Sequence, residues 1–441
     1  MIFHCTHLVL QLYFVALMKP NGYNTFMDEL AANDHKKLGK ELGLFVFSDT
    51  VGKGLPLFTP KGSVIRRELE RFIVDEELKR GYLHVYTPDI AKIELYKKSG
   101  HYPYYKDSMY APIQIEDEEF MLRPMTCPHH FELYLSVPHS YRELPMRIAE
   151  LAKLYRFEQS GELMGLQRVR TFCLADAHII TQVENAEKEI GDVLDLIEFI
   201  AATFKLEQGK EFHYRLSLGD RTDAKKYFKD DASWDIAEES LRKVLKDRNA
   251  HFVEAQNEAA FYGPKIDVQM QNTNGKEDTA FTVQYDFVMP KRFDLTYVNE
   301  KGEQEQPIVI HRSSIGAIER VMAFLIEHYS GAFPTWLSPN QVTILPVSEK
   351  FEKYATEVLN ALKTANIRVD MDNSNNTLGN KIREATLQKV PYMCIIGGQE
   401  EEKSKGDSQI VTVRGRGGRD LGQTEVKEFI SQIQKEIETK Q

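Results

Sequence analysis

The hydrophobic and polar positions divide most of the chain into helices and short strands. Apolar residues recur at helical spacing over 58–82, and Gly81 stands where that helix would take its C-terminal cap. The region 213–310 contains three strand patterns, FYGPKIDVQMQ, TAFTVQYDFVM and LTYVN, separated by turn residues, together with one helix. Strands with few strand–helix–strand alternations predict an α+β fold, in which helices flank an antiparallel sheet.

The pattern changes near the sequence WLSPNQVTILPV, where apolar strands begin to alternate with amphipathic helices. Such alternation predicts a separate α/β domain with a mainly parallel sheet. We place the boundary between Trp336 and Gln341, which gives predicted domains over 28–337 and 338–441.

The first 18 residues are apolar, but they lack the basic start and the small-residue cleavage site of a signal peptide. We interpret 1–27 as an N-terminal extension that is either disordered or not translated, with Met18 and Met27 as alternative starts. No run of 18 apolar residues occurs, so we expect no membrane association. The scattered cysteines fit a reducing cytoplasm. They are Cys5, Cys127, Cys173 and Cys394.

Composition adds one constraint on possible partners. The chain is 42% hydrophobic and 28% charged with a net charge of −10, which is ordinary globular composition and excludes a generic polyanion binder. The charge is uneven, because 341–441 carries 15 of the 56 Lys and Arg residues and 15 of the 66 Asp and Glu residues. A neutral C-terminal domain can still present a local basic face to RNA.

The strongest chemical signal is an Arg-rich segment from Arg147 to His178. A strand-like run is followed by a polar loop with two glycines and then by a second strand. The residues of interest are Arg156, Glu158, Gly161, Gly165, Arg168, Arg170 and Phe172. Arg presents a planar, permanently charged fork that grips phosphate bidentately, and Phe172 could stack on a base. Since the chain has neither a GxGxxG nor a Walker sequence, phosphate binding falls to these side chains.

This segment resembles motif 2 of the class II aminoacyl-tRNA synthetases. The helix at 58–82, followed by a strand and Pro88, resembles their dimer-forming motif 1, although an edge strand on a helix is an alternative. The sequence IVIHRSSIGAIERVMAFLIEHY resembles motif 3, with Arg320 as its arginine. Over about 28–441 the chain resembles the threonyl-tRNA synthetases, through AFYGPKID, TVQYDF, FPTWLSPNQV, KIREATLQKVPYMCIIG and RGGRDLG.

The resemblance implies a class II synthetase sheet, a C-terminal α/β anticodon-binding domain and a cytoplasmic homodimer. Its implied activity is ATP-dependent ligation of L-threonine to tRNA(Thr), with Mg²⁺ accompanying ATP. Because only 1–27 precede the synthetase-like part, we also expect no editing domain within this chain, and either measurable mischarging with serine or a separate protein that removes serine from tRNA.

Three residues are connected by the resemblance alone: Cys127 in LRPMTCPHH, His178 in LADAH and His311 in VIHR. Taken singly, Cys127 reads as a small buried hydrophobe and the histidines as core residues. The resemblance implies that they bind one zinc ion per subunit and leave a fourth position open for the amino acid. Zinc that binds the threonine hydroxyl would reject valine. Serine has the hydroxyl and lacks only a methyl group, a difference that gives a discrimination of roughly 10–200-fold between substrates.

The resemblance assigns further roles position by position. The ATP-binding residues would be Arg156, Glu158, Arg168, Phe172 and Arg320. The amino acid would be bound by Met125, Asp176, Tyr262 and Gln284. The catalytic residues would be Arg156, Arg320, His101, which would lie near the terminal ribose, and Lys265. Anticodon bases would be read by Asn375, Glu400 and Arg414.

The chain departs from the family pattern at three places. Cys173-Leu174-Ala175 replaces Thr-Gln-Asp, the stretch 278–281 replaces Trp-Gln-Cys-Gly, and CPHH replaces CPGH. A prolyl or seryl enzyme is an alternative that the Cys and His set opposes. A non-catalytic, synthetase-like RNA-binding or regulatory protein is a second alternative, and the presence of Arg156 and Arg320 opposes it. A bare tRNA-binding module is a third, opposed by the share of the chain that resembles a catalytic domain.

Overall fold

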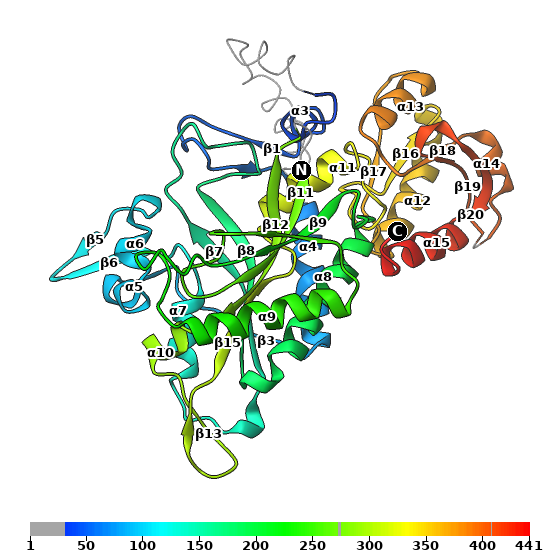
Figure 1. The fold of residues 1–441 in the computed structure, drawn as a ribbon. Coiled ribbons are helices and arrows are strands. Elements are labelled where there is room, and N and C mark those ends of the chain that lie inside the picture. The colour runs from blue at the N-terminus through cyan, green and yellow to red at the C-terminus, as the bar shows by residue number, and fades with distance from the viewer. Residues whose placement is uncertain (1–30, 272–274, 407) are drawn as a thin grey trace.

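The computed structural model describes residues 31–271, 275–406 and 408–441, and Figure 1 gives their arrangement. The predicted extension 1–27 lies outside the described residues. The first described helix is α3 (His35–Glu41), and the Asp34 side chain caps it by accepting from the Lys36 amide.

An eight-stranded sheet forms the centre of the larger domain, in the order β10-β9-β11-β12-β15-β8-β7-β3. All neighbours from β9 to β7 pair antiparallel, while β10 and β3 pair parallel at the two edges. This confirms the α+β fold class. The strands are β3 (Leu83–His84), β7 (Met146–Tyr155), β8 (Thr171–Thr181), β9 (Phe212–Ser217), β10 (Phe252–Ala255), β11 (Lys265–Gln271), β12 (Glu277–Asp286) and β15 (Ile308–Ser313).

Helices α8 and α9 pack side by side against β12, β15 and β11, and α11 packs against β8 (Figure 1). The predicted helix at 58–82 is α4, which the Thr59 hydroxyl caps at its start and which ends in a Schellman arrangement at Gly81, whose φ is +76°. The helices are α4 (Pro60–Lys79), α5 (Ile93–Ser99), α6 (His101–Tyr104), α7 (Cys127–Tyr134), α8 (Ala186–Thr203), α9 (Asp231–Asp247), α10 (Met289–Phe293) and α11 (Ile318–His328).

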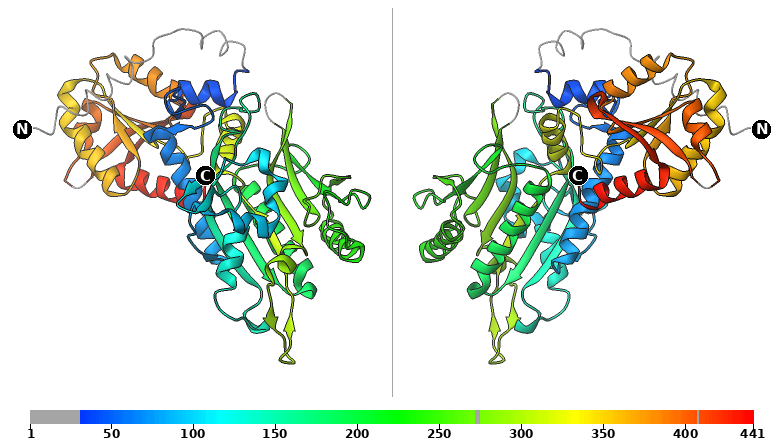
Figure 2. Two further views of the ribbon diagram at one scale, coloured as in Figure 1. Left: turned by 90° about the vertical axis from the view of Figure 1, so that its left-hand side faces the viewer. Right: turned by 90° about the vertical axis from the view of Figure 1, so that its right-hand side faces the viewer.

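Three smaller sheets accompany the large one in this domain, and the β13–β14 hairpin projects from its lower end as drawn in Figures 1 and 2. Their strands are β1 (Phe45–Val46), β2 (Leu57–Phe58), β4 (Ile90–Lys92), β5 (Ile113–Ile115), β6 (Glu118–Leu122), β13 (Tyr297–Val298) and β14 (Gln304–Glu305).

The C-terminal domain contains a five-stranded sheet in the order β17-β16-β18-β19-β20. The β16 pairings are parallel, but β18–β19 and β19–β20 are antiparallel, so the expectation of a mainly parallel sheet was wrong for half of it. Between β19 and β20 a tight turn at Gly417 and Gly418, both at positive φ, returns the chain as a hairpin in place of a crossover helix. The elements are β16 (Val342–Pro346), α12 (Glu352–Thr364), β17 (Val369–Met371), α13 (Leu378–Leu387), β18 (Tyr392–Ile396), α14 (Gly398–Lys403), β19 (Ile410–Gly415), β20 (Asp420–Glu425) and α15 (Val426–Glu438).

The two domains have separate hydrophobic cores that are joined by polar contacts. Among the described residues, three clusters of buried apolar side chains lie within 38–337 and two lie within 342–433. Arg368 donates to the Trp336 carbonyl (2.7 Å), and Arg416 donates to the carbonyls of Ala332 (2.9 Å) and Phe333 (2.6 Å). Among the described residues, no helix is both long and apolar enough to cross a membrane.

Candidate functional site

A cavity of about 510 Å³ lies over the face of the large sheet. Its lining includes every residue that the sequence assigned to ATP, the amino acid, transfer or the metal. They are His101, Met125, Cys127, Arg156, Glu158, Arg168, Phe172, Asp176, His178, Tyr262, Lys265, Gln284, His311 and Arg320. The fold therefore brings together side chains that are more than 200 residues apart in sequence.

The two-residue period of β8 explains how one strand serves both the core and the cavity. Cys173, Ala175, Ala177 and Ile179 belong to the hydrophobic core, whereas Phe172, Leu174, Asp176 and His178 line the cavity. Successive side chains of a strand point to opposite faces, so the alternation follows directly from the backbone.

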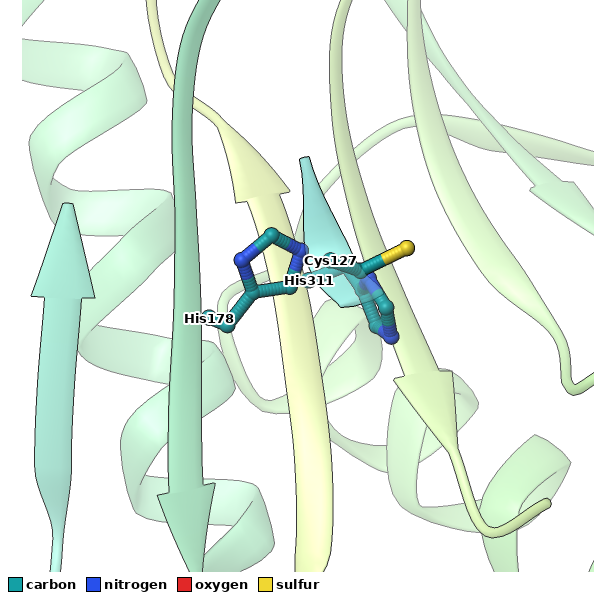
Figure 3. Close-up of side chains that lie close together, drawn as sticks. All are labelled: Cys127, His178 and His311. Carbon is teal, nitrogen blue, oxygen red and sulfur yellow. The ribbon is translucent and has the colours of Figure 1, made fainter. Parts of the chain in front are cut away.

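Cys127, His178 and His311 are all buried, and one potential ligand atom from each lies within 4.8 Å of the others. Cys127 begins α7, and the two histidines are direct cross-strand neighbours on β8 and β15 (Figure 3). One sulfur and two imidazole nitrogens form a donor set that suits zinc, with a fourth position available for a substrate.

Neighbouring side chains hold each histidine in the tautomer that a metal requires. Asp286 accepts from His311 Nε2 (2.7 Å), which leaves the lone pair on Nδ1. Glu150 accepts from His130 Nε2 (3.3 Å), so His130 Nδ1 can accept from His178 Nδ1 (2.8 Å) and leave the lone pair on His178 Nε2. The residues present therefore fit a zinc ion.

Burial also determines the protonation of these groups. Desolvation raises the pKa of the Cys127 thiol well above its usual value, with the carboxylates of Asp176 and Asp286 adding to the effect. Desolvation lowers the pKa of His178, with further lowering by His311 and His130. A neutral histidine is ready to ligate, whereas the thiol becomes an anion only when a cation is bound beside it.

The predicted pair of strands around a long loop is present, because β7 and β8 pair from Met146 opposite Ile180 to Tyr155 opposite Thr171. The second strand begins later than expected, so Arg168 and Arg170 lie in the loop. The Arg156 guanidinium lies 5.1 Å from the centre of the Phe172 ring. Burial lowers the pKa of Arg156, so the site holds a desolvated cation that a bound polyanion would stabilise.

Arg320 lies in the first turn of α11, just after Gly316, whose φ is +74°. Its guanidinium donates to the carbonyls of Gln167 (3.0 Å) and Thr279 (2.7 Å). Arg168, which lies beside Gln167 in the loop between β7 and β8, donates to the Glu158 carboxylate (2.8 Å). Desolvation lowers the pKa of Arg320 as well, so Arg156 and Arg320 bring two partly buried, desolvated guanidinium groups to one cavity.

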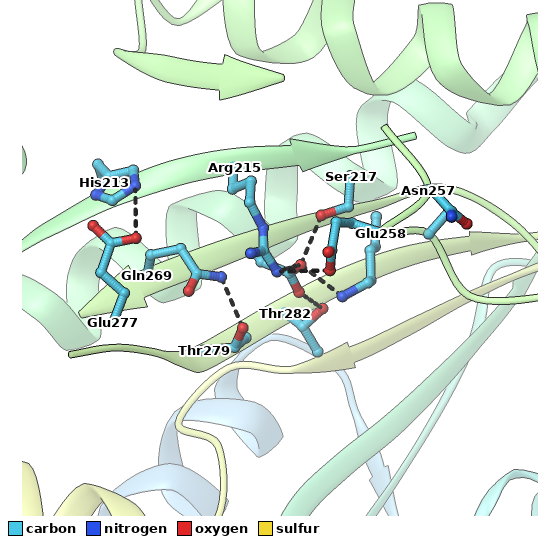
Figure 4. A network of polar contacts seen from close by, with 12 residues as sticks. His213, Arg215, Ser217, Asn257, Glu258, Gln269, Glu277, Thr279 and Thr282 are labelled. Atoms are coloured by element: carbon cyan, nitrogen blue, oxygen red, sulfur yellow. Dashed lines mark hydrogen bonds and ion pairs between the residues drawn. The ribbon is translucent and has the colours of Figure 1, made fainter. Parts of the chain in front are cut away.

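A network of hydrogen bonds extends across the sheet from the set formed by Cys127, His178 and His311. Tyr262 stacks against His311 and donates to Gln284 (2.5 Å), which donates to Thr282 (3.4 Å). Thr282 donates to Asp267 (3.1 Å), a buried carboxylate that also accepts from Lys265 (2.6 Å). Arg215 and Ser217 also donate to Asp267, and Figure 4 shows their side chains close to Thr282.

His101 is 3% exposed and its Nδ1 lies 2.7 Å from the Ser99 hydroxyl. Desolvation, followed by the charges of His311, Arg292 and Arg156, lowers the pKa of His101 to about 3. The ring is therefore neutral at physiological pH.

The three candidate anticodon residues lie in the C-terminal domain. Asn375 is exposed after β17, and Arg414 is part of β19. Glu400 is only 6% exposed, and its carboxylate accepts from Thr412 (2.6 Å), Gln423 (2.9 Å) and the Gly397 amide (2.9 Å). To contact a base, Glu400 would have to exchange some of these bonds.

Sequence reasoning missed His130, Glu150, Asp267 and Asp286. The two-residue period of a strand could have identified Asp286, because it stands two positions after Gln284 and so lies on the same face of that strand. The departures from the family pattern lie at the cavity itself, since Leu174, Ala280 and Phe281 are part of its lining.

Residues 110–329 match the model of the tRNA synthetase class II core domain (G, H, P, S and T), and residues 341–436 match the anticodon binding domain. A curated threonine–tRNA ligase from Anoxybacillus flavithermus is 47% identical over 416 residues, which is 94% of this chain and 64% of the relative. One from Listeria monocytogenes is 45% identical over 431 residues, covering 97% and 66%. The chain thus spans just under two thirds of the length of these relatives.

A solved structure, described as the RNA binding domain of threonyl-tRNA synthetase from Cryptosporidium parvum Iowa II, superposes with a TM-score of 0.84. The identity is 34%, and the match covers 91% of this chain and 98% of that one.

Proposed function

The chain belongs to the threonyl-tRNA synthetase family, and on that premise we propose that it activates L-threonine with ATP and transfers it to tRNA(Thr). The observation that carries the proposal is the meeting of the Cys127, His178 and His311 set with Arg156 and Arg320 in one cavity. Relatives that share this fold and nearly half of the sequence are threonine–tRNA ligases.

In the first step, a threonine carboxylate oxygen attacks the α-phosphorus of ATP, the bond to the bridging oxygen breaks, and pyrophosphate leaves. Arg156 stabilises the negative charge that develops at the α-phosphate, and Arg320 holds the distal phosphates. Phe172 stacks on the adenine base, while Glu158 orients Arg168 beside the nucleotide. Mg²⁺ would accompany ATP and neutralise phosphate charge.

In the second step, a hydroxyl of the terminal ribose of tRNA attacks the threonyl carbonyl carbon, and AMP leaves with the electron pair of the mixed anhydride bond. His101 lies beside the reacting ribose, where its neutral ring can accept a hydrogen bond from the hydroxyl. Lys265, paired with Asp267, places a positive charge at the same end of the cavity.

Cys127, His178 and His311 would hold the zinc ion, which supplies a Lewis-acid site for the amino group and the hydroxyl of threonine. Asp176, whose pKa burial raises, accepts a hydrogen bond from that hydroxyl, and Met125, Tyr262 and Gln284 enclose the rest of the amino acid. Valine cannot supply the hydroxyl. Serine can, so we propose either that tRNA(Thr) is measurably mischarged with serine or that a separate editing protein removes it.

Amino-acid-dependent ATP–pyrophosphate exchange tests this proposal. Threonine should stimulate exchange, serine should do so about 10–200-fold less well, and valine and proline should give background. Exchange should disappear on zinc chelation and return when zinc is restored. Exchange with proline alone would indicate a prolyl enzyme. If none of these amino acids stimulates exchange, the residues Leu174, Ala175 and Phe281 have cost the activity, and a regulatory RNA-binding protein is favoured.

We propose the same domain division as the sequence indicates, with 28–337 catalytic and 338–441 binding the anticodon. The family matches at 110–329 and 341–436 and the separate hydrophobic cores support this division. Asn375, Glu400 and Arg414 remain the proposed base contacts. We propose a cytoplasmic location, where translation takes place.

We propose that the chain forms a homodimer through β3. This strand is the outermost one of the large sheet on its side, and Leu83 and Tyr86 are 57% and 96% exposed there. An open strand edge flanked by apolar side chains can pair with a second copy about a two-fold axis.

Introducing a charge at this edge should separate the subunits. Leu83→Asp combined with Tyr86→Asp is expected to halve the mass measured by light scattering, because the interface would bury carboxylates that have no paired charge. The matched control is Ile236→Asp, which charges a 54% exposed side chain on α9 and should leave the mass unchanged. A doubly charged variant that keeps the mass of the unmodified protein would exclude this interface.

A further inference from the structure

A second buried cluster lies outside the cavity and consists of Asp34, His35 and Glu327. The Leu166 amide donates to His35 Nε2 (3.2 Å), and His35 Nδ1 lies 2.6 Å from Glu327 Oε1. A backbone amide can only donate, so Nε2 carries the lone pair and Nδ1 carries the hydrogen that Glu327 accepts. Both ring nitrogens are therefore used within the protein, which makes the cluster a closed hydrogen-bonded set rather than a metal site.

His35 holds a tight turn in the loop between β7 and β8. Within that turn, Met164 and Arg168 exchange backbone hydrogen bonds (3.1 and 3.3 Å), and Gly165 has a φ of +51°. A β-carbon on Gly165 would lie 2.1 Å from His35 Nε2, so the glycine allows the turn to rest against the imidazole ring. The turn and the ring thus fit each other by both hydrogen bonding and shape.

The same turn fixes the position of Arg320. The Gln167 carbonyl, one residue after Leu166, accepts from Arg320 Nε (3.0 Å), and the Gln167 side chain donates to Glu327 (3.5 Å). Arg320 and Glu327 are seven residues apart on α11, so they share one face of that helix. Helix α11 therefore contacts the turn directly through Arg320 and Glu327, and indirectly through His35, which is bound to Glu327.

The segment before α4 holds this loop at a second place. The Gly54 carbonyl accepts from the Arg170 amide (2.8 Å). Gly54 has a φ of +74°, and a β-carbon there would lie 2.7 Å from the Leu163 side chain. The stretch from Asp34 to Gly54 consequently braces both ends of the loop segment that carries Arg168.

We propose that His35 is a positioning residue for ATP binding. The His35 ring accepts a hydrogen bond from the Leu166 amide and so fixes the turn from Met164 to Arg168. In this turn the Gln167 carbonyl orients Arg320, and Arg168 follows directly after Gln167. The inference rests on the proposed function, because it assigns to His35 the placement of the side chains that bind the nucleotide in that reaction.

Two amide substitutions separate the hydrogen bonds of His35. Gln at position 35 can place a carbonyl oxygen near the location of Nε2 and accept from Leu166, whereas Asn reaches only the location of Nδ1 and can only satisfy Glu327. We expect His35→Asn to raise the KM for ATP about tenfold, because the free-energy cost of leaving the buried Leu166 amide unpaired would displace the turn that orients Arg320, with the threonine KM unchanged. His35→Gln should stay within about twofold of the unmodified protein.

The matched control is His139→Ala, which removes a buried histidine whose nitrogens contact Glu143 (3.0 Å) and the Tyr134 carbonyl (2.9 Å) and which does not line the cavity. It should lower the unfolding temperature and leave the KM for ATP unchanged. If His35→Asn behaves in the same way, His35 is merely structural and the proposal is overturned.

Deuterium exchange of peptides over 159–170 provides a readout that needs no catalysis. Exchange in this segment should accelerate in His35→Asn but not in His35→Gln or His139→Ala. Should the unmodified protein catalyse no pyrophosphate exchange with any amino acid, the proposed function fails by itself. The rate of deuterium exchange would then decide separately whether His35 holds the turn. An unchanged rate over 159–170 in His35→Asn would reject this role for His35.

Discussion

Replacing Cys127 with alanine is expected to abolish zinc binding and threonine activation together. The cavity offers one sulfur and two imidazole nitrogens, and each histidine is already oriented by Asp286 or by His130. Loss of a residue that merely orients a ligand commonly costs 10–100-fold in metal affinity or activity, so loss of a ligand should lower threonine-dependent exchange by at least about 100-fold. Zinc content and pyrophosphate exchange would be measured on the same preparation.

Cys394 supplies the matched control, because it is a fully buried cysteine in the core of the C-terminal domain. Cys394→Ala removes the same sulfur from a packed interior and should cost stability only, with one zinc per subunit and full exchange retained. A Cys127→Ala protein that still bound zinc and activated threonine would remove the metal from the proposed mechanism.

Replacing Arg156 with alanine is expected to lower the kcat/KM of pyrophosphate exchange about 1,000-fold, which is the scale found when a charged transition-state contact is removed. Burial lowers the pKa of this guanidinium, and its cavity also contains Arg320, so the site is built to bind concentrated negative charge. Arg156→Lys should recover only part of the loss, because an ammonium group cannot bind phosphate as a fork.

Arg147, at the opposite end of β7, is the control for Arg156. It donates to Glu189 at 2.8 and 2.7 Å, outside the cavity. Arg147→Ala should reduce stability and leave exchange within about twofold of the unmodified protein. Near-normal exchange by Arg156→Ala would contradict the assignment of the phosphate clamp.

The Cys127→Ala and Arg156→Ala variants should each lose a different binding property. Cys127→Ala should still bind ATP, which equilibrium binding of the nucleotide can measure, while Arg156→Ala should still contain zinc. Loss of both properties in either variant would indicate a collapsed cavity rather than a missing group.

The sequence by itself determined the secondary structure and much of the chemistry. The helical period over 58–82 predicted α4, including the cap at Gly81, whereas Asp176 and His178 were identified by the family resemblance alone. Periods of 3.6 and 2 are local, so they can be found without knowing the fold. Family motifs added the residues that proved to line a single cavity.

Only the tertiary structure decided which residues support those groups. The path from Glu150 through His130 to His178, the bond from His311 to Asp286, and the contact of His35 with both Leu166 and Glu327 join positions between 20 and 292 residues apart. Such contacts leave no periodic signature, because strand order and loop packing create them. The physical reason is that a side chain's tautomer and orientation depend on the atoms around it in space, and sequence neighbours supply few of those atoms in a buried site.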